Sequence, residues 1–368
     1  MHFIDLQIQY QKYKKEVDAA IQNVLDSSKY INGPQVAELE QTLADYVGTI
    51  HGVGFSSGTE SLKATLMAWE IGPGDEVITT PFTFIASGEV IAVIGAKPVF
   101  VDVDPNTLNI DPTKIEAAIT PRTKAIIPVS LYGQCANLNA INIIASRHKI
   151  PVLEDGCQSF GAIYNDERSC GISTAGATSF FPAKPLGCYG DGGMTFTNDE
   201  NLANRLHIIR EHGQAARYRH AMLGGNGRLD TIQAAILLAK FPFFEEEVEN
   251  RQKVANYYIK NLPKGARPPT IRPGNKSVFS QFTIRVKERD RVQKLLTEQD
   301  IPTAIHYPVP LHRQPVFAYL AHKADDFPVA QKAASEVLSL PMHPFMTTNQ
   351  QDQVLAALTK SLVEAGGE

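Results

Sequence analysis

The feature that most constrains the fold is an alternation of short apolar runs and longer helical patterns between residues 52 and 197. The short runs are rich in β-branched residues and nearly continuous in their apolar character, which is typical of strands buried on both faces. They span residues 77–80, 98–101, 125–129, 151–154 and 177–181. Helical patterns lie between them at 61–70, 85–94 and 138–148. We therefore expect an α/β fold with a mainly parallel sheet flanked by helices.

The pattern changes after residue 229. A helical pattern without glycine runs from 229 to 259 and is broken only by Pro242. A Pro/Gly-rich loop at 267–274 precedes a strand candidate at 279–286, a helix at 290–299 and a strand at 301–306. We predict two domains: a large one over 1–245, whose amphipathic N-terminal helix at 10–25 precedes the main sheet, and a small α+β domain over 246–368.

Composition excludes several classes of protein. The 368 residues carry a formal net charge of −4 without a Lys/Arg-rich run, so a nucleic-acid partner is not expected. The first residues lack a signal-peptide pattern, and no apolar stretch is long enough to span a membrane. The four cysteines show no C-x-x-C pairing and no matching histidine array. These features predict a cytoplasmic protein with reduced thiols, no membrane partner and no metal site.

In an open parallel sheet, ligands bind beyond the carboxyl ends of the strands, and unusual residues follow several predicted strands. Gly58 and Thr59 open a helix after the strand around Val53, where free backbone N–H groups could hold a phosphate. The alternative is an ordinary helix cap. Phe84 follows the run at 77–80 and could stack on a planar ring, or could simply pack in the core.

A carboxylate and a lysine follow two further strands. Asp155 leaves a buried strand and needs a polar partner there, although a surface loop or a helix cap would also explain it. Lys184 lies between small residues and prolines, where neither a regular helix nor strand pairing suits it. Burial would lower its pKa and make the amine nucleophilic, whereas the alternative is an ordinary solvated lysine.

Together these sites match what pyridoxal 5'-phosphate requires: an amine for its aldehyde, a carboxylate for its pyridine nitrogen, a stacking ring and a phosphate clamp. Asp155 would keep the pyridine nitrogen protonated. Lys184 would carry the cofactor as a Schiff base and later act as general base and acid. This set predicts a pyridoxal-phosphate enzyme.

A series of motifs also resembles the DegT/StrS-like family of nucleotide-sugar aminotransferases. They are Gly58-Thr59-Glu60, Pro81-Phe82-Thr83-Phe84, Glu154-Asp155-Gly156-Cys157-Gln158-Ser159, Ser179-Phe180-Phe181-Pro182-Ala183-Lys184, Gly190-Asp191-Gly192-Gly193 and Asn226-Gly227-Arg228-Leu229-Asp230. The similarity runs from Phe3 to about the last twenty residues. It implies the fold-type I architecture of aspartate aminotransferase.

The resemblance also implies roles, residue by residue. Lys184 would form the Schiff base and Asp155 would pair with the pyridine nitrogen, while Gln158 would hydrogen-bond the ring oxygen and Phe84 would stack on the ring. The phosphate would be held by Gly58, Thr59 and Ser179, and by Asn226 from a neighbouring subunit. A homodimer with shared active sites follows from that last role.

Two positions depart from the family pattern. The family often has Asp at the position of Glu60, and often two alanines at Gly156 and Cys157. Glu60 is therefore given no role, and Cys157 is interpreted as a small packing residue.

Within the family, the chain is most similar to enzymes that transaminate a UDP-linked 3-keto sugar acid with glutamate as donor, giving a 3-amino sugar for bacterial surface polysaccharide such as the O-antigen. This similarity rests on residues 128–135, 184–191 and 303–308. A carboxylate and a diphosphate require cations and donors, and Arg228, His306 and Tyr307 are the candidates. The alternatives are an ion pair of Arg228 with Asp230, and an ordered turn at His306-Tyr307.

Three alternative functions make different demands on the sequence. A 4-aminotransferase acting on a UDP- or dTDP-4-keto sugar stays open, because nothing physical in the sequence selects the keto position. A sugar 3-dehydratase of the same family would carry histidine in place of Lys184. A non-catalytic regulator or binding protein could lose Lys184 or Asp155, and this chain retains both.

Overall fold

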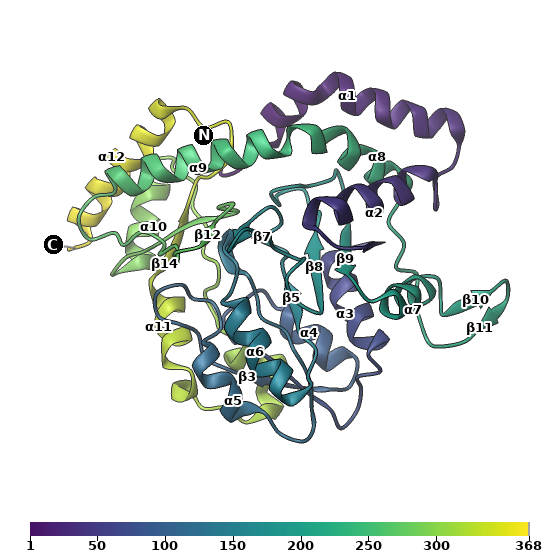
Figure 1. The fold of residues 1–368 in the computed structure, drawn as a ribbon. Coiled ribbons are helices and arrows are strands. Elements are labelled where there is room, and N and C mark those ends of the chain that lie inside the picture. The colour runs from purple at the N-terminus through teal and green to yellow at the C-terminus, as the bar shows by residue number, and fades with distance from the viewer. Residues whose placement is uncertain (367–368) are drawn as a thin grey trace.

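The computed structural model describes residues 1–366, and its centre is a mixed sheet flanked by helices (Figure 1). β5 pairs parallel with β8, whereas β9 pairs antiparallel with β8 and β1. β2 pairs parallel with β3 and β4, and bridges at Ile126–Val152 and Val129–Asp155 join the two groups. The strand order is thus β1-β9-β8-β5-β4-β2-β3, with β9 reversed. The expected mainly parallel sheet is confirmed.

The strands of this sheet are β1 His51–Phe55, β2 Glu76–Thr79, β3 Lys97–Phe100, β4 Thr123–Ile126, β5 Leu153–Asp155, β8 Ala175–Ser179 and β9 Gly193–Thr197. β2, β3, β4, β5 and β8 begin within two residues of the runs predicted for them, β1 lies where a strand was expected around Val53, and no run was predicted for β9. Several runs extend past the observed strand ends because their last residues leave the sheet and form its carboxyl edge. That edge is where the candidate residues lie.

The helices around the sheet begin at recognisable caps. α3 begins after Ser57, whose side chain accepts from the Glu60 backbone N–H, and Trp69 is the C-cap residue that follows its last residue, Ala68. α6 begins after Asn137, which accepts from the Ala140 N–H. The helices of the large part are α1 Leu6–Ser27, α2 Pro34–Val47, α3 Gly58–Ala68, α4 Ala86–Val93, α5 Ile115–Ala118, α6 Leu138–His148 and α7 Glu200–Arg210.

The long helical pattern at 229–259 is two helices. α8 spans Thr231–Lys240 and α9 spans Phe244–Asn261, with a 3₁₀ turn at Phe241–Phe243 between them. Proline cannot donate an N–H and clashes with the preceding turn, so the break falls at Pro242. α1 lies along α8, and α9 leads on to the C-terminal elements (Figure 1).

The C-terminal part is built on a two-stranded antiparallel sheet. Its elements are β13 Phe282–Arg285, β14 Val337–Leu340, α10 Arg289–Thr297, α11 Pro328–Glu336 and α12 Thr348–Glu364. The strand predicted at 301–306 is wrong, because only Ala304 makes a single bridge, to Ser339. Pro302 lacks the N–H that a paired strand would need there.

Hydrophobic clusters bear on the division into domains. One cluster draws all its buried members from residues 254–365 and includes Tyr258 and Phe282. Another joins Phe82 and Phe100 of the large part to Phe317 from the C-terminal part. We propose that the boundary at 245/246 separates two folding units, with the segment around 311–337 packed on the larger one.

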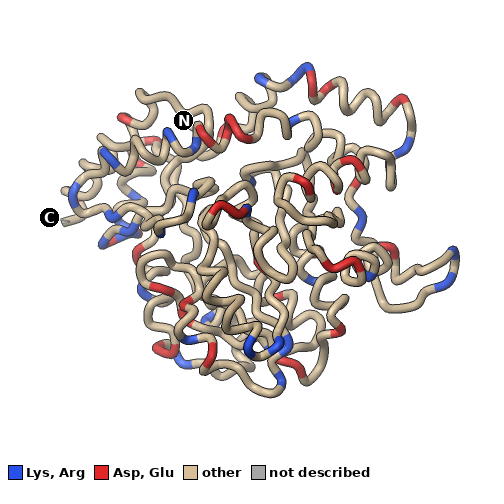
Figure 2. The backbone as a smooth tube through the Cα atoms, viewed as in Figure 1, with Lys and Arg blue, Asp and Glu red and all other residues tan. Residues whose placement is uncertain are grey.

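Two smaller sheets lie outside the main one. β12 Asn275–Lys276 pairs with β6 Ile163–Tyr164, which pairs with β7 Glu167–Arg168. β10 Gln214–Ala216 and β11 Arg219–His220 form a hairpin that projects from the body and carries basic residues at its tip (Figure 1; Figure 2). Elsewhere positive and negative side chains are interspersed (Figure 2).

Two kinds of feature are absent from residues 1–366. No helix there is long and apolar enough to cross a membrane. No group of three or more His, Cys, Asp or Glu side chains within the same range could hold a metal ion.

Candidate active site

Lys184 lies in the turn that follows β8. Its backbone N–H donates to the Phe181 carbonyl at 2.8 Å, and its side chain is half-buried. Within the described residues the ammonium makes no hydrogen bond or ion pair. Burial and then the charge of Lys184 lower the pKa of His306 to about 4. Burial raises the pKa of the Cys157 thiol, and the positive charge of Lys184 partly counteracts this rise. The structure thus places an unengaged amine near His306 and Cys157.

Asp155 ends β5, beside the strand that leads to Lys184. Its side chain is 5% exposed, and its two oxygens accept from the Ser87 hydroxyl at 2.6 Å and the Cys157 N–H at 3.2 Å. Ser87 lies on α4 and also shares a 3.1 Å hydrogen bond with Thr83. No cation of the described chain lies within ion-pair distance of Asp155. The buried carboxylate therefore has neutral donors only and can accept a further one.

Gln158 follows Asp155 and is oriented from both ends of its amide. The Tyr132 N–H donates to its Oε1 at 2.8 Å, and its Nε2 donates to the Tyr307 hydroxyl at 3.1 Å. The Tyr132 hydroxyl in turn donates to the His306 carbonyl. Tyr132 thus holds Gln158 and the His306–Tyr307 segment in one arrangement.

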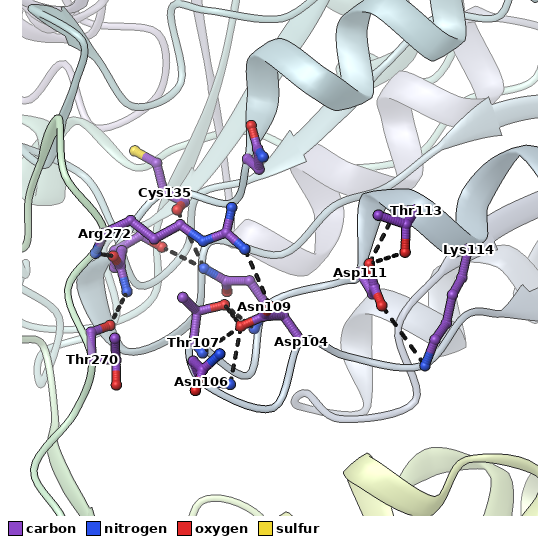
Figure 3. A network of polar contacts seen from close by, with 12 residues as sticks. Asp104, Asn106, Thr107, Asn109, Asp111, Thr113, Lys114, Cys135, Thr270 and Arg272 are labelled. Atoms are coloured by element: carbon purple, nitrogen blue, oxygen red, sulfur yellow. Dashed lines mark hydrogen bonds and ion pairs between the residues drawn. The ribbon is translucent and has the colours of Figure 1, made fainter.

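Tyr132 adopts a left-handed backbone conformation, with φ of 58°, in a turn that is held by other loops. Asn109 accepts from the Leu131 N–H at 2.9 Å and donates to the carbonyls of Gln134 and Cys135. Figure 3 shows Asn109 in this network, together with the 3.2 Å ion pair of Arg272 with Asp104. The surrounding hydrogen bonds offset the cost of the unfavourable conformation.

Phe84 and Tyr307 lie at the same edge. Phe84 is 52% exposed, and its ring centroid lies 6.1 Å from that of Tyr307 at an interplanar angle of 43°. Burial, followed by the charge of Asp155, raises the pKa of the Tyr307 phenol. An exposed aromatic face with a neutral hydroxyl beside it suits a planar, polar ligand.

The N-terminus of α3 points into the same region. Gly58 is its first residue, and a Cβ there would lie 2.7 Å from the Ser179 Cβ and 2.8 Å from the Cys157 Sγ. The Thr59 side chain is exposed. Backbone N–H groups at a helix start favour an anion. Gly58, Thr59 and Ser179 therefore lie close together, next to Asp155 and its loop.

Glu60 is engaged elsewhere. Its carboxylate pairs with Lys63 at 2.6 Å, on the same helix. Its other oxygen faces the turn at 225–227, where a Cβ on Gly227 would lie 3.3 Å away. The pairing offsets the negative charge that Glu60 adds near the helix start.

Asn226 and Arg228 lie on a segment beside Ser56, whose N–H donates to the Gly227 carbonyl at 2.8 Å. Asn226 is exposed. Arg228 pairs with Glu211 at 3.0 Å rather than with Asp230, the partner considered from the sequence. Its Nε is buried without a hydrogen-bond partner in the described chain. This segment therefore presents an amide to solvent and keeps one guanidinium nitrogen unsatisfied.

His306 and Tyr307 approach the edge from the C-terminal part. The His306 Nδ1 lies 2.8 Å from the Ser339 hydroxyl. With its pKa near 4, His306 is neutral at physiological pH and can act as a donor or an acceptor through one ring nitrogen. The sequence-predicted residues thus meet at one edge, except that Asn226 and Arg228 lie on a neighbouring segment.

Some contributors were not assigned a role from the sequence. Ser87 lies in the first turn of α4, three residues after Phe84 and four after Thr83, so it is close to both in the chain. Tyr132 lies within the family-like segment at 128–135, but no local pattern shows which side chains Tyr132 or Glu211 contacts. Their partners become visible only in three dimensions.

Comparison with known proteins identifies the family. The model of the DegT/DnrJ/EryC1/StrS aminotransferase family matches residues 11–359. The chain is 53% identical to UDP-2-acetamido-2-deoxy-3-oxo-D-glucuronate aminotransferase of Pseudomonas aeruginosa, over 98% of this chain and 99% of that protein. It is 47% identical to a pleiotropic regulatory protein of Geobacillus stearothermophilus, over 97% of each chain.

A solved structure agrees. Ntda from Bacillus subtilis, with bound cofactor PMP, is 30% identical, and the two structures superpose with a TM-score of 0.90 over 98% of this chain and 83% of that chain. The chain therefore belongs to the DegT/DnrJ/EryC1/StrS aminotransferase family and is an aminotransferase.

Proposed function

We propose that the protein uses pyridoxal 5'-phosphate to transfer the amino group of glutamate to UDP-2-acetamido-2-deoxy-3-oxo-glucuronate. The product would be a UDP-linked 3-amino sugar acid for bacterial surface polysaccharide such as the O-antigen. The observation that carries the substrate is the 53% identity, over nearly the full length of both chains, to the aminotransferase named for that sugar.

The donor set fits the cofactor. The buried Asp155 carboxylate has only neutral partners in the described chain, so a protonated pyridine nitrogen can supply the charge that it lacks. Lys184 has an unengaged amine, and the α3 N-terminus with Ser179 offers N–H and hydroxyl groups to a phosphate. Each requirement is met at one edge of the sheet.

When bound, pyridoxal phosphate supplies an aldehyde for the amino group and a ring that withdraws electrons. We propose that the Lys184 amine would hold the cofactor at its aldehyde carbon and, when free, would remove and return the proton at the carbon bearing the amino group. Asp155 keeps a proton on the pyridine nitrogen. Gln158 donates to the ring oxygen and Phe84 packs on the ring face. Gly58, Thr59 and Ser179 bind the phosphate.

The sugar would be held by residues that approach from outside the carboxyl edge of the sheet, which we call the rim. Arg228 is suited to bind the uronate carboxylate bidentately, and His306 and Tyr307 offer neutral polar groups to sugar or diphosphate oxygens. We propose that Asn226 completes the phosphate site of a neighbouring subunit in a homodimer. The exposure of Asn226 and the unsatisfied Nε of Arg228 support this arrangement.

All four cysteines are free thiols in the described chain, which suits the reducing cytoplasm that we propose as its location.

Light scattering of the purified protein will test the dimer. A monomer at working enzyme concentration would contradict the shared site.

The substrate is tested by incubating the protein, reconstituted with pyridoxal phosphate, with glutamate and the UDP-linked 3-keto sugar acid. We expect a mass increase of the sugar that matches replacement of oxygen by NH₂ plus hydrogen, with nitrogen at C3 by NMR. A UDP-4-keto sugar run in parallel should react far more slowly. Preferred amination of the 4-keto sugar would replace the proposed substrate. Absence of both reactions and of a visible absorption band would contradict the enzymatic proposal.

A further inference from the structure

The loop of residues 182–190 carries Lys184 and folds back on itself. The Cys188 N–H donates to the Phe180 carbonyl at 2.8 Å, and the Cys188 thiol also points to that carbonyl at 3.0 Å. A Cβ at Gly187 would lie 2.5 Å from the Pro182 carbonyl oxygen, so the two sides of the loop touch. The position of Lys184 therefore depends on whatever fixes the far side of the loop.

Lys240, the last residue of α8, reaches that far side. Its side chain is 4% exposed, its ammonium donates to the Gly187 carbonyl, and it lies 5.1 Å from the centroid of the Tyr189 ring. No carboxylate of the described chain lies within ion-pair distance of it. A buried ammonium with a carbonyl as its only hydrogen-bond partner is costly, so a purely structural site would favour an apolar residue.

The titratable groups around Lys240 come from other elements. Glu247 and Arg251 lie on α9, and Cys188 lies in the loop itself. Burial lowers the pKa of Lys240 to about 8, whereas Glu247 opposes this shift. The ammonium is thus shielded from water while it holds the loop.

Gln233 holds the same loop one residue beyond Cys188. Its Oε1 accepts from the Tyr189 N–H at 2.9 Å, and its Nε2 donates to the Tyr189 carbonyl at 3.4 Å. Residues seven apart on a helix lie on one face, so Gln233 and Lys240 contact the loop from the same side of α8. Both bind backbone atoms, which fixes the path of the chain rather than one side chain.

We propose that Gln233 and Lys240 are positioning residues that clamp the loop and so present the Lys184 amine to the cofactor. This inference rests on the assignment of Lys184 to the cofactor. Both contacts join atoms of one chain and involve no substrate atom. The clamp can therefore form before substrate binds. Loosening it should weaken cofactor capture and lower kcat more than it raises the KM for the sugar.

The test uses apo protein titrated with pyridoxal phosphate and followed by visible absorbance and induced circular dichroism. Lys240→Met and Gln233→Ala should each raise the Kd roughly tenfold, since each loses hydrogen bonds to the loop. The circular dichroism per bound cofactor should fall, because the cofactor is held less rigidly. Lys240→Arg, which keeps a charged donor, should recover part of both signals.

Controls separate the clamp from general destabilisation. Lys260→Met removes an exposed lysine of α9, and Leu358→Ala opens the core of α12 at a fully buried position. Neither should change the cofactor Kd, although Leu358→Ala will lower the Tm. Wild-type Kd and circular dichroism in folded Gln233→Ala would overturn the clamp, as would an equal change in Leu358→Ala. Gln233→Ala decides the matter if Lys240→Met does not fold.

Lys184→Ala distinguishes this inference from the proposed function. If that variant keeps the visible band and turnover of the wild type, the assignment of Lys184 fails and the clamp fails with it. If the band is lost while the α8 variants behave as wild type, only the clamp is wrong.

Discussion

The rim around Asp155 and Lys184 differs from the segment at 226–228 in how far a single chain satisfies its polar groups. At the rim, Asp155 has two donors and Gln158 is held from both ends. On the segment, Asn226 is exposed and the Arg228 Nε has no partner in the described chain. One chain thus orients Asp155 and Gln158 at the rim, whereas it leaves polar groups of the segment without partners in the described residues.

Lys184→Ala should have the largest effect, because it removes the amine on which the rim is centred. Turnover should fall on the order of 10⁴-fold, the upper range for loss of a general acid–base group. Steady-state and single-turnover kinetics will measure it. An exposed lysine of α12, changed in Lys360→Ala, is the matched control and should keep wild-type rates.

Asp155→Asn keeps the shape of the side chain and removes its charge. We expect turnover to fall roughly 10²–10³-fold, comparable to the loss of one preorganised electrostatic contact. Ser87→Ala, which removes one donor to the same carboxylate, should cost about tenfold. Rates of Asp155→Asn within a factor of two of wild type would show that the carboxylate does not act on the cofactor.

Arg228→Lys tests the segment rather than the rim. Lysine cannot make the bidentate contact of a guanidinium, so the KM for the sugar acid should rise about 10- to 100-fold. The half-reaction with glutamate, followed by the loss of visible absorbance, should keep its rate. A slower glutamate half-reaction with an unchanged sugar KM would reverse the roles of the two regions.

His306 gives the smallest effect, and it appears in stability. Its pKa is lowered to about 4 in the folded protein, against 6.5 for an unperturbed histidine. The unfolded chain therefore takes up this proton first as pH falls, and the associated stability, present above 6.5, is lost between about 6.5 and 4. Urea unfolding across this window measures how the free energy of unfolding depends on pH. In His306→Asn this dependence should be smaller than in the wild type, by up to about one proton taken up on unfolding.

His343 is the internal comparison for that measurement, because its pKa is also lowered to about 4, chiefly by burial. A variant at His343 should reduce the linkage by a similar amount. If His306→Asn leaves the pH dependence unchanged, His306 is not held neutral by its surroundings.

The sequence predicted the fold well wherever local signals and burial agree. The helix at 138–148 matches α6, since Asn137 caps it and its apolar positions repeat with helical spacing. Continuous apolar runs in the sequence indicate the parallel strands. The strand predicted at 301–306 failed because pairing depends on a distant partner, and β13 pairs with β14 instead.

The candidate site was predicted as a set of residues but not as a set of contacts. The place of Asp155 and Lys184 follows from strand order, which the alternating pattern indicates. Asp155 accepts from Ser87, which lies 68 residues away in the chain, and Arg228 pairs with Glu211, which lies 17 residues away. Such pairs depend on tertiary packing, which local spacing in the sequence does not predict.

Because α3 is short, a tryptophan at its end lies close enough to the proposed phosphate site to serve as a fluorescent probe of that site. Its first residue belongs to the proposed phosphate site, and the only tryptophan of the chain, Trp69, caps its other end. Eleven helical residues at 1.5 Å each separate the two by about 16 Å. At such a separation, tryptophan emission can transfer its energy to a chromophore that absorbs near visible wavelengths. Dimming of the indole fluorescence would therefore report cofactor occupancy without a label and without touching the site.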